Sequence, residues 1–137
     1  MKKILTLLLL IFVTGAFNLI TAQEREIPVK ISVYNPVRGQ TQGNPLETAS
    51  GYIIDLKKLK SGQLRVCAIS RKLHKKYGGP FKFGDIIYIS CGDSRFDGPW
   101  VIRDLMGPRS RHENKVDLLF DATKLKHGVK QGTIRRE

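Results

Sequence analysis

The sequence predicts a mainly β protein, folded as a small closed barrel of six short strands with one or two short helices. Short apolar segments rich in β-branched and aromatic residues recur along the chain. Glycine, proline, asparagine and aspartate separate these segments, as is typical of tight turns. A sandwich would give the same pattern, but a closed barrel leaves no strand edge exposed, which matters for strands this apolar.

Six segments have the composition or the alternation of strands. In residues 27–36, apolar and polar residues alternate with a period of two until Asn35 and Pro36 indicate a turn. The other segments carry apolar residues between turn signals. We expect strands at residues 27–36, 64–70, 85–91, 99–105, 115–120 and 129–136.

The segments between these strands include one long loop and two short helical stretches. Residues 37–51 contain three glycines and a proline without any period, and long ordered loops of this kind are more often functional than idle. Residues 71–80 can hold one helical turn before a pair of glycines stops it. Residues 121–128 begin with an aspartate suited to an N-cap and end with a glycine, which predicts one short helix.

The first 22 residues have the pattern of an export signal. Lys2 and Lys3 precede an apolar run at residues 4–13, and Ala22 is a small residue suited to cleavage. The run is short for a membrane span, and no cysteine follows it closely enough to carry a lipid. We expect residues 23–137 to form one exported domain, in the periplasm or outside the cell, without a membrane anchor.

The chain expected after cleavage is strongly basic. Loss of Lys2 and Lys3 leaves 22 basic and 12 acidic side chains, a formal charge of +10. Such a surface favours polyanions. Export argues against nucleic acid as the partner and leaves the anionic polymers of the envelope, although the charged run at residues 57–65 could equally be a solvated face.

The cysteines and histidines do not have the spacing of a metal site. Cys67 and Cys91 form no Cys-x-x-Cys or Cys/His motif, and His74, His112 and His127 are scattered among basic residues. We therefore expect neither a metal nor a cofactor. Both cysteines lie in strand-like segments, where they could pair as a disulfide or remain two buried thiols.

Two aspartates stand among strand-forming apolar residues. Asp104 ends one strand, and Asp117 interrupts the next on the face opposite Val116 and Leu118. Because a buried charge is costly without a partner, each acid could simply accept hydrogen bonds from loop amides or pair with an arginine. In a closed barrel their strands can converge, and a carboxyl group beside another in a partly dry cleft gains a raised pKa that suits general-acid catalysis.

Five segments, in this order and spacing, carry a resemblance to a known family: TASG (48–51), CAISRKL (67–73), GGPFKFGDIIYI (78–89), WVIRDLMGPR (100–109) and NKVDLLF (114–120). Together they resemble the exported three-aspartate (3D) domain of membrane-bound lytic transglycosylase A. The similarity to rare lipoprotein A and the expansins is more distant. The resemblance spans roughly residues 30–135 and implies a six-stranded double-psi β-barrel.

The resemblance also implies roles for individual residues. Asp104 matches the proposed general acid/base of the family, and Asp117 matches an acid thought to support the site. Tyr34 and Thr48 match positions of the substrate groove. Ser70 stands where the first of the three aspartates is expected, so two of the three acids are present, and we expect Ser70 to contact the substrate at that position.

Three functions are open at this point. The first is an exported, monomeric lytic transglycosylase that cleaves between N-acetylmuramic acid and N-acetylglucosamine and leaves a 1,6-anhydro product. The second is a non-catalytic barrel that binds peptidoglycan or another envelope glycan, which the loss of one aspartate favours. The third is a structural or interaction protein. In the first two, Trp100 or Tyr34 on the groove floor would stack on a sugar, although a lone tryptophan in a strand is more often core.

Overall fold

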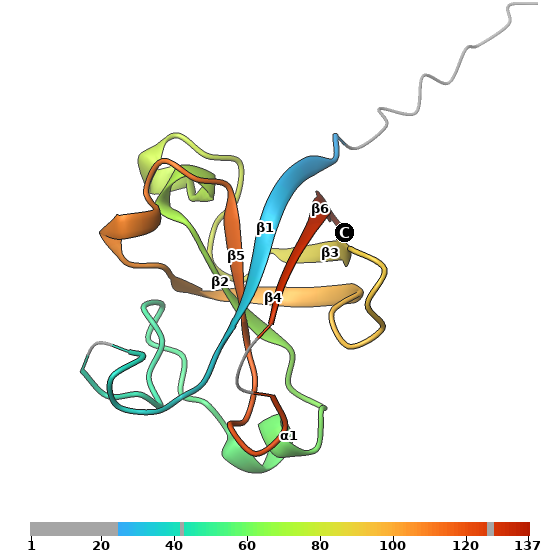
Figure 1. The fold of residues 1–137 in the computed structure, drawn as a ribbon. Coiled ribbons are helices and arrows are strands. Elements are labelled where there is room, and N and C mark those ends of the chain that lie inside the picture. The colour runs from blue at the N-terminus through green and yellow to red at the C-terminus, as the bar shows by residue number, and fades with distance from the viewer. Residues whose placement is uncertain (1–24, 42, 126–127) are drawn as a thin grey trace, which may run out of the picture.

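The computed structural model describes residues 25–41, 43–125 and 128–137. In this part of the chain six strands close into a mixed β-barrel (Figure 1). The mainly β barrel predicted from the sequence is confirmed. The predicted export signal, residues 1–22, lies outside the described residues. None of the described helices is long and apolar enough to cross a membrane.

The strands match the six predicted segments to within a few residues. They are β1 (Ile27–Tyr34), β2 (Val66–Ile69), β3 (Ile86–Ser90), β4 (Gly98–Leu105), β5 (Lys115–Leu119) and β6 (Val129–Arg136). The described residues also form one α-helix, α1 (Leu56–Lys60), and three 3-10 turns, Arg71–Leu73, Lys75–Tyr77 and Pro108–Ser110.

Each described strand pairs with two neighbours, so the barrel closes. The order around it is β1-β5-β2-β4-β3-β6, and β6 pairs again with β1. The pairs β1·β5 and β2·β4 are parallel, and the other four pairs are antiparallel. Closure leaves none of these strands with an unpaired edge, which removes the usual route to edge-to-edge aggregation.

Large apolar side chains from all six strands fill the barrel interior. In β3 the alternation is clear, because Ile87 and Ile89 are fully buried while Ile86 and Ser90 are exposed. The fully buried interior side chains are Ile31, Cys67, Ile69, Ile87, Ile89, Phe96, Ile102, Val116, Leu118 and Ile134. Removal of this apolar surface from water is the main force that holds the barrel together.

β2 is buried on both of its faces. Cys67 belongs to the interior core, whereas Ala68 belongs to a second apolar cluster. Ile54, from the segment that precedes α1, and Leu59, from α1 itself, pack in that second cluster. The loop and helix thus cover the outer face of β2, and a strand covered on both sides needs a continuous apolar sequence, as β2 has.

The helix α1 lies in the charged run that the sequence suggested was a solvated face. It begins at Asp55, whose carboxylate accepts hydrogen bonds from the backbone N–H groups of Lys57 (3.0 Å) and Lys58 (3.1 Å). Its lysines are exposed, but Leu59 is buried against β2. The run is therefore solvated on one side and part of the core on the other.

The prediction of a helix at residues 121–128 is wrong for the described part of this segment, residues 121–125. These residues form a single turn. Asp121 does cap this turn, because its carboxylate accepts a hydrogen bond from the N–H of Thr123 (3.0 Å). The turn does not continue as a helix, since the buried Asn35 side chain donates to the carbonyl of Leu125 (2.8 Å) and ties the segment to the end of β1.

The two cysteines are free thiols in the structure. Cys67 lies completely buried in β2, whereas Cys91 follows β3 and is half-buried. Burial raises the pKa of both thiols. Of the two alternatives left by the sequence, the structure has the unpaired one.

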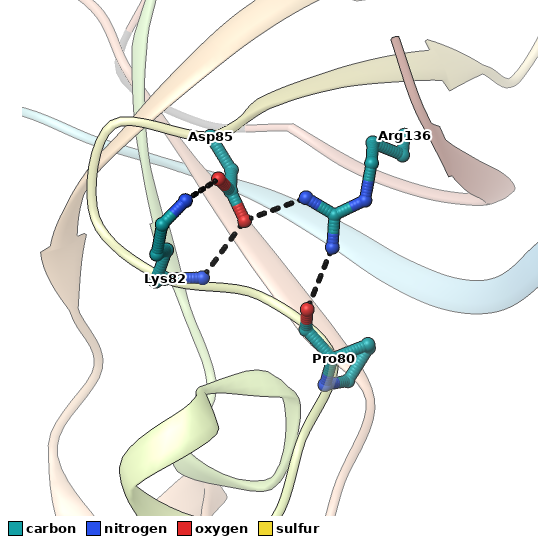
Figure 2. Close-up of polar contacts among 4 residues, drawn as sticks. All are labelled: Pro80, Lys82, Asp85 and Arg136. Carbon is teal, nitrogen blue, oxygen red and sulfur yellow. Dashed lines mark hydrogen bonds and ion pairs between the residues drawn. The ribbon is translucent and has the colours of Figure 1, made fainter.

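Asp85 joins the turn before β3 to the last strand (Figure 2). Its carboxylate accepts hydrogen bonds from the backbone N–H (3.0 Å) and the ammonium group (2.9 Å) of Lys82, and from the guanidinium group of Arg136 (2.9 Å). Arg136 also donates to the carbonyl of Pro80 (2.7 Å). Burial alone would raise the pKa of Asp85, but these donors lower it to about 2.

We predict that Asp85→Asn lowers the free energy of unfolding at pH 7 by about 1 to 3 kcal/mol, because hydrogen bonds to a charged partner are lost. The pKa of Asp85 falls on folding from 3.8 to about 2, so its stabilising effect is present above that range and disappears as the pH falls through it. Urea denaturation should show a difference between wild type and variant at pH 7 that is largely lost at pH 2.

The control is Glu113→Gln, which removes an exposed carboxylate that makes no side-chain hydrogen bond or ion pair with the described residues. It should leave stability unchanged at both pH values. An equal stability of wild type and Asp85→Asn at pH 7 would contradict the proposed link between the turn and β6.

Candidate functional site

A cleft of about 570 Å³ opens beside β2. One wall comes from the long loop after β1, through Gln40, Asn44 and Thr48 among others. The opposite side is formed by the ends of the strands and by the segment after β4, with Met106 and Gly107. Residues of the loop at 37–51, which the sequence predicted to be functional, thus line this cleft.

Strand register brings the two candidate acids to the same cleft. Ala68 of β2 pairs with Asp104 on β4 and with Asp117 on β5, and all three residues line the cleft. Since neighbouring strands lie about 4.8 Å apart, the Cα atoms of the two aspartates are about 10 Å apart across the small side chain of Ala68. The predicted convergence of the two strands is therefore present.

A β-bulge turns Asp104 toward the cleft. Cys67 pairs with Ile102, but the next residue, Ala68, pairs with Asp104, so Arg103 is an extra residue in β4. Strict alternation would point Asp104 to the same side as the interior residue Ile102. Bulges of this kind commonly re-aim a side chain beside a functional site.

Asp104 is held by three hydrogen bonds. One carboxylate oxygen accepts from the hydroxyl of Tyr34 (3.0 Å), and the other accepts from the backbone N–H groups of Ala49 (2.8 Å) and Leu105 (2.9 Å). The pKa of Tyr34 is raised well above its ordinary value, first by burial and then by the charge of Asp104. Tyr34 therefore stays a neutral donor, and Asp104 is a fixed acceptor that links β1, the long loop and β4.

Asp117 is held less firmly. The described structure gives its carboxylate one hydrogen bond, from the hydroxyl of Ser32 (3.1 Å) on the paired strand β1. Burial raises the pKa of Asp117 to about 6, and the charge of Asp104 adds to this, although Ser32 and Lys115 act in the opposite direction. An acid with this pKa can both release and accept a proton near neutral pH.

The other predicted site residues divide between the cleft and the core. Thr48 lines the cleft, where its hydroxyl hydrogen-bonds with that of Ser50 (3.0 Å). Trp100 does not line it. Its indole is buried in the barrel core, and its N–H donates to the carbonyl of Phe96 (2.7 Å), so Trp100 lies outside this cleft, and its expected stacking on a sugar stays a prediction.

Ser70 also lies outside the cleft lining. Its hydroxyl donates to the carbonyl of Glu113 (2.6 Å) and accepts from the N–H of Lys115 (3.1 Å). The side chain is completely buried and joins the end of β2 to the start of β5. Both hydrogen bonds of Ser70 thus hold the fold together, and its expected contact with a substrate stays a prediction.

Arg71 is a cleft residue that the sequence analysis missed. It lines the cleft together with the two acids, directly after Ser70. In the sequence it is one cation in the basic segment 71–80, which predicts a helical turn but does not show which of its cations faces the cleft. No cluster of three or more histidine, cysteine or acidic side chains suited to a metal ion occurs in the described part of the chain.

We predict opposite effects of two amide substitutions on stability. The pKa of Asp117 rises on folding from 3.8 to about 6, so the stability that its protonated form contributes is lost as the pH rises through that range. Asp117→Asn should therefore unfold at a higher urea concentration than wild type at pH 7.5, with a gain of about 1 to 3 kcal/mol, and the gain should vanish near pH 4.

Asp104→Asn is the matched comparison, since it replaces an acceptor that serves three donors. It should lower stability at both pH values by about 1 to 3 kcal/mol. If Asp117→Asn were as stable as wild type, or less stable, at pH 7.5, the buried, proton-exchanging state of Asp117 would be ruled out.

The chain matches no protein-family model, and a comparison with curated proteins gives no match either.

Proposed function

We propose that this protein is an exported lytic transglycosylase of the peptidoglycan, built on a double-psi barrel of the 3D type. The observation that carries the proposal is the pair Asp104 and Asp117, placed on either side of Ala68 in one cleft of about 570 Å³, with the pKa of Asp117 raised to about 6. Paired carboxyl groups that differ in protonation are the recurring solution for cleavage of glycosidic bonds.

The barrel topology is compatible with the double-psi fold that the resemblance implies. Six strands close with two parallel pairs, β1·β5 and β2·β4, between strands far apart in the chain. The formal charge of +10 expected after signal cleavage supports an anionic polymer as the partner. Export to the periplasm or the cell exterior would bring the protein to the peptidoglycan, whose peptide stems carry carboxylates.

The proposed roles of the two acids follow from their surroundings. The family resemblance gives the acid/base role to Asp104, but all three of its hydrogen bonds come from donors that fix it as an acceptor. Asp117, with the raised pKa, is better suited to move a proton. We therefore assign proton transfer to Asp117, and to Asp104 the stabilisation of the positive charge that develops at C1 of the sugar.

The reaction needs one proton and no water. The carboxyl group of Asp117 donates its proton to the glycosidic oxygen while the bond between that oxygen and C1 of N-acetylmuramic acid breaks. The carboxylate of Asp117 then accepts the proton of the C6 hydroxyl, and the C6 oxygen forms a bond to C1. The products are a 1,6-anhydro end and a free hydroxyl on N-acetylglucosamine, and Asp117 has regained its proton.

A non-catalytic glycan-binding barrel is the second candidate. Two observations favour it: the residue at the position of the first family aspartate, Ser70, is fully used in structural hydrogen bonds, and both oxygens of Asp104 already have protein donors. A binder would need the cleft and its polar lining but no proton transfer.

Incubation of the purified protein with peptidoglycan distinguishes the two candidates. We expect release of soluble 1,6-anhydro muropeptides, detected by mass spectrometry, at a rate that falls as the pH rises above about 6, where Asp117 loses its proton. Asp117→Asn should reduce the rate at least 100-fold, as expected for loss of general acid–base catalysis (about 10²- to 10⁴-fold). Glu113→Gln should retain it.

Two results would speak against the enzyme. Protein that sediments with peptidoglycan but releases no anhydro product would support the binder. If Asp117→Asn released anhydro muropeptides at the wild-type rate, the assignment of proton transfer to Asp117 would be wrong. The rate of Asp104→Asn would then show whether the acid/base role lies with Asp104.

A further inference from the structure

Arg71 is held rigidly at the cleft. It begins the 3-10 turn Arg71–Leu73. In this turn the N–H of Leu73 donates to the carbonyl of Ser70 (3.0 Å). The hydroxyl of the buried Ser70 donates to the carbonyl of Glu113 and accepts from the N–H of Lys115. The backbone of Arg71 is therefore fixed by the same serine that stands in the position of the first family aspartate.

The side chain of Arg71 contacts an aromatic ring but forms no ion pair with an acidic side chain among the described residues. Its guanidinium carbon lies 5.5 Å from the centroid of the Tyr77 ring, a cation–π contact. Its Nε atom is buried and has no hydrogen-bond partner among the described residues. A buried N–H group without a partner is rare in proteins, and such a group calls for an explanation, such as backbone or side-chain strain, a functional role, or a water or ion that completes the hydrogen bond.

None of the acids of the cleft pairs with Arg71 in the described structure. Asp104 is occupied by Tyr34 and two backbone amides, and Asp117 by Ser32. Glu47, the third acid that lines the cleft, forms no ion pair with Arg71 either. The cleft thus contains a cation that none of its described acids neutralises, beside three acids whose carboxylates would repel an anionic ligand.

We propose that Arg71 binds a carboxylate on the muramoyl residue of the ligand and thereby selects an acidic glycan over a neutral one. This inference rests on the proposed function, since it names the substrate group that the same cleft recognises. The planar donor fork of an arginine fits a carboxylate with two parallel hydrogen bonds. Its charge offsets the repulsion between such a ligand and the two aspartates.

Carboxylates of two kinds are available on a muramoyl residue. One is that of the lactyl group, which is free where the peptide stem has been removed. The others belong to the stem itself. Both present the same chemistry to Arg71, so ligands with and without the stem are needed to tell them apart.

The test measures the affinity of the purified protein for three ligands by NMR titration: chitotetraose, which has no carboxylate; glycan strands stripped of their peptides; and muropeptides with intact stems. We expect Arg71→Gln to weaken binding of the acidic ligands by about 10- to 100-fold, the range for loss of a charged hydrogen-bonded pair, and to leave chitotetraose unaffected. Loss confined to stripped strands would identify the lactyl group, and loss confined to intact muropeptides the stem.

The matched control is Arg135→Gln. Arg135 also stacks on a tyrosine, with its guanidinium carbon 4.4 Å from the centroid of the Tyr88 ring, but it lies on β6 and does not line the cleft. The substitution Arg135→Gln removes the same charge as Arg71→Gln. It should change none of the three affinities by more than about twofold. The thermal midpoint of each variant verifies that it is folded.

The inference is overturned if Arg71→Gln leaves all three affinities unchanged, or weakens the neutral and acidic ligands equally. Its failure differs from that of the proposed function. If Arg71→Gln selectively weakens acidic ligands but the protein never releases anhydro product, the proposed role of Arg71 is supported and the proposed enzymatic function is not. If the protein releases anhydro product but Arg71→Gln does not selectively weaken acidic ligands, the enzymatic function is supported and the role of Arg71 is not. Absence of binding to all three ligands would remove both.

Discussion

The extra residue in β4, Arg103, is the constraint on which the cleft depends. Without it, the alternation set by Ile102 would direct Asp104 into the apolar interior, where a carboxylate without water is strongly destabilising. The bulge also positions the wall of the cleft, because the carbonyl of Arg103 accepts the N–H of Ser50 (3.2 Å) while Asp104 accepts that of Ala49. One irregularity in one strand thus orients the acid and fastens the loop opposite it.

The two acids show how similar residues acquire different properties in one fold. Both pair in register with Ala68, and both are half-buried. Asp104 receives three hydrogen bonds and serves as a structural centre, whereas Asp117 receives one and has its pKa raised by burial. The difference arises from the neighbours: the cleft loop supplies an amide to Asp104, whereas among the described residues Asp117 has the hydroxyl of Ser32 as its one donor. A site that moves a proton tolerates this incomplete solvation because the protonated form is neutral.

The strands were predictable from the sequence because apolar residues with turn signals between them are a local pattern, and the long loop was recognisable by its glycines. The convergence of Asp104 and Asp117 was predictable only as a consequence of barrel closure. The positions of Ser70 and Trp100 were not, since a polar hydroxyl or an indole can face either a groove or a core, and only tertiary partners decide. The helix at 121–128 failed for the same reason: the side chain of Asn35, distant in sequence, holds that segment as a turn. Arg71 was hidden within a basic segment.

The first and last strands lie side by side, and this has a consequence for how the chain reaches its final state. In the part of the chain that the structure describes, β1 has β5 and β6 as its partners, and the hydrogen bond between Ser32 and Asp117 spans 85 positions. A chain that emerges from the ribosome N-terminus first therefore holds β1 without neighbours until almost all of it has been made. Long-range pairing of this kind is slow to form. The barrel therefore stays unclosed at this seam until the last strand has been made, so its closure is a late step in folding.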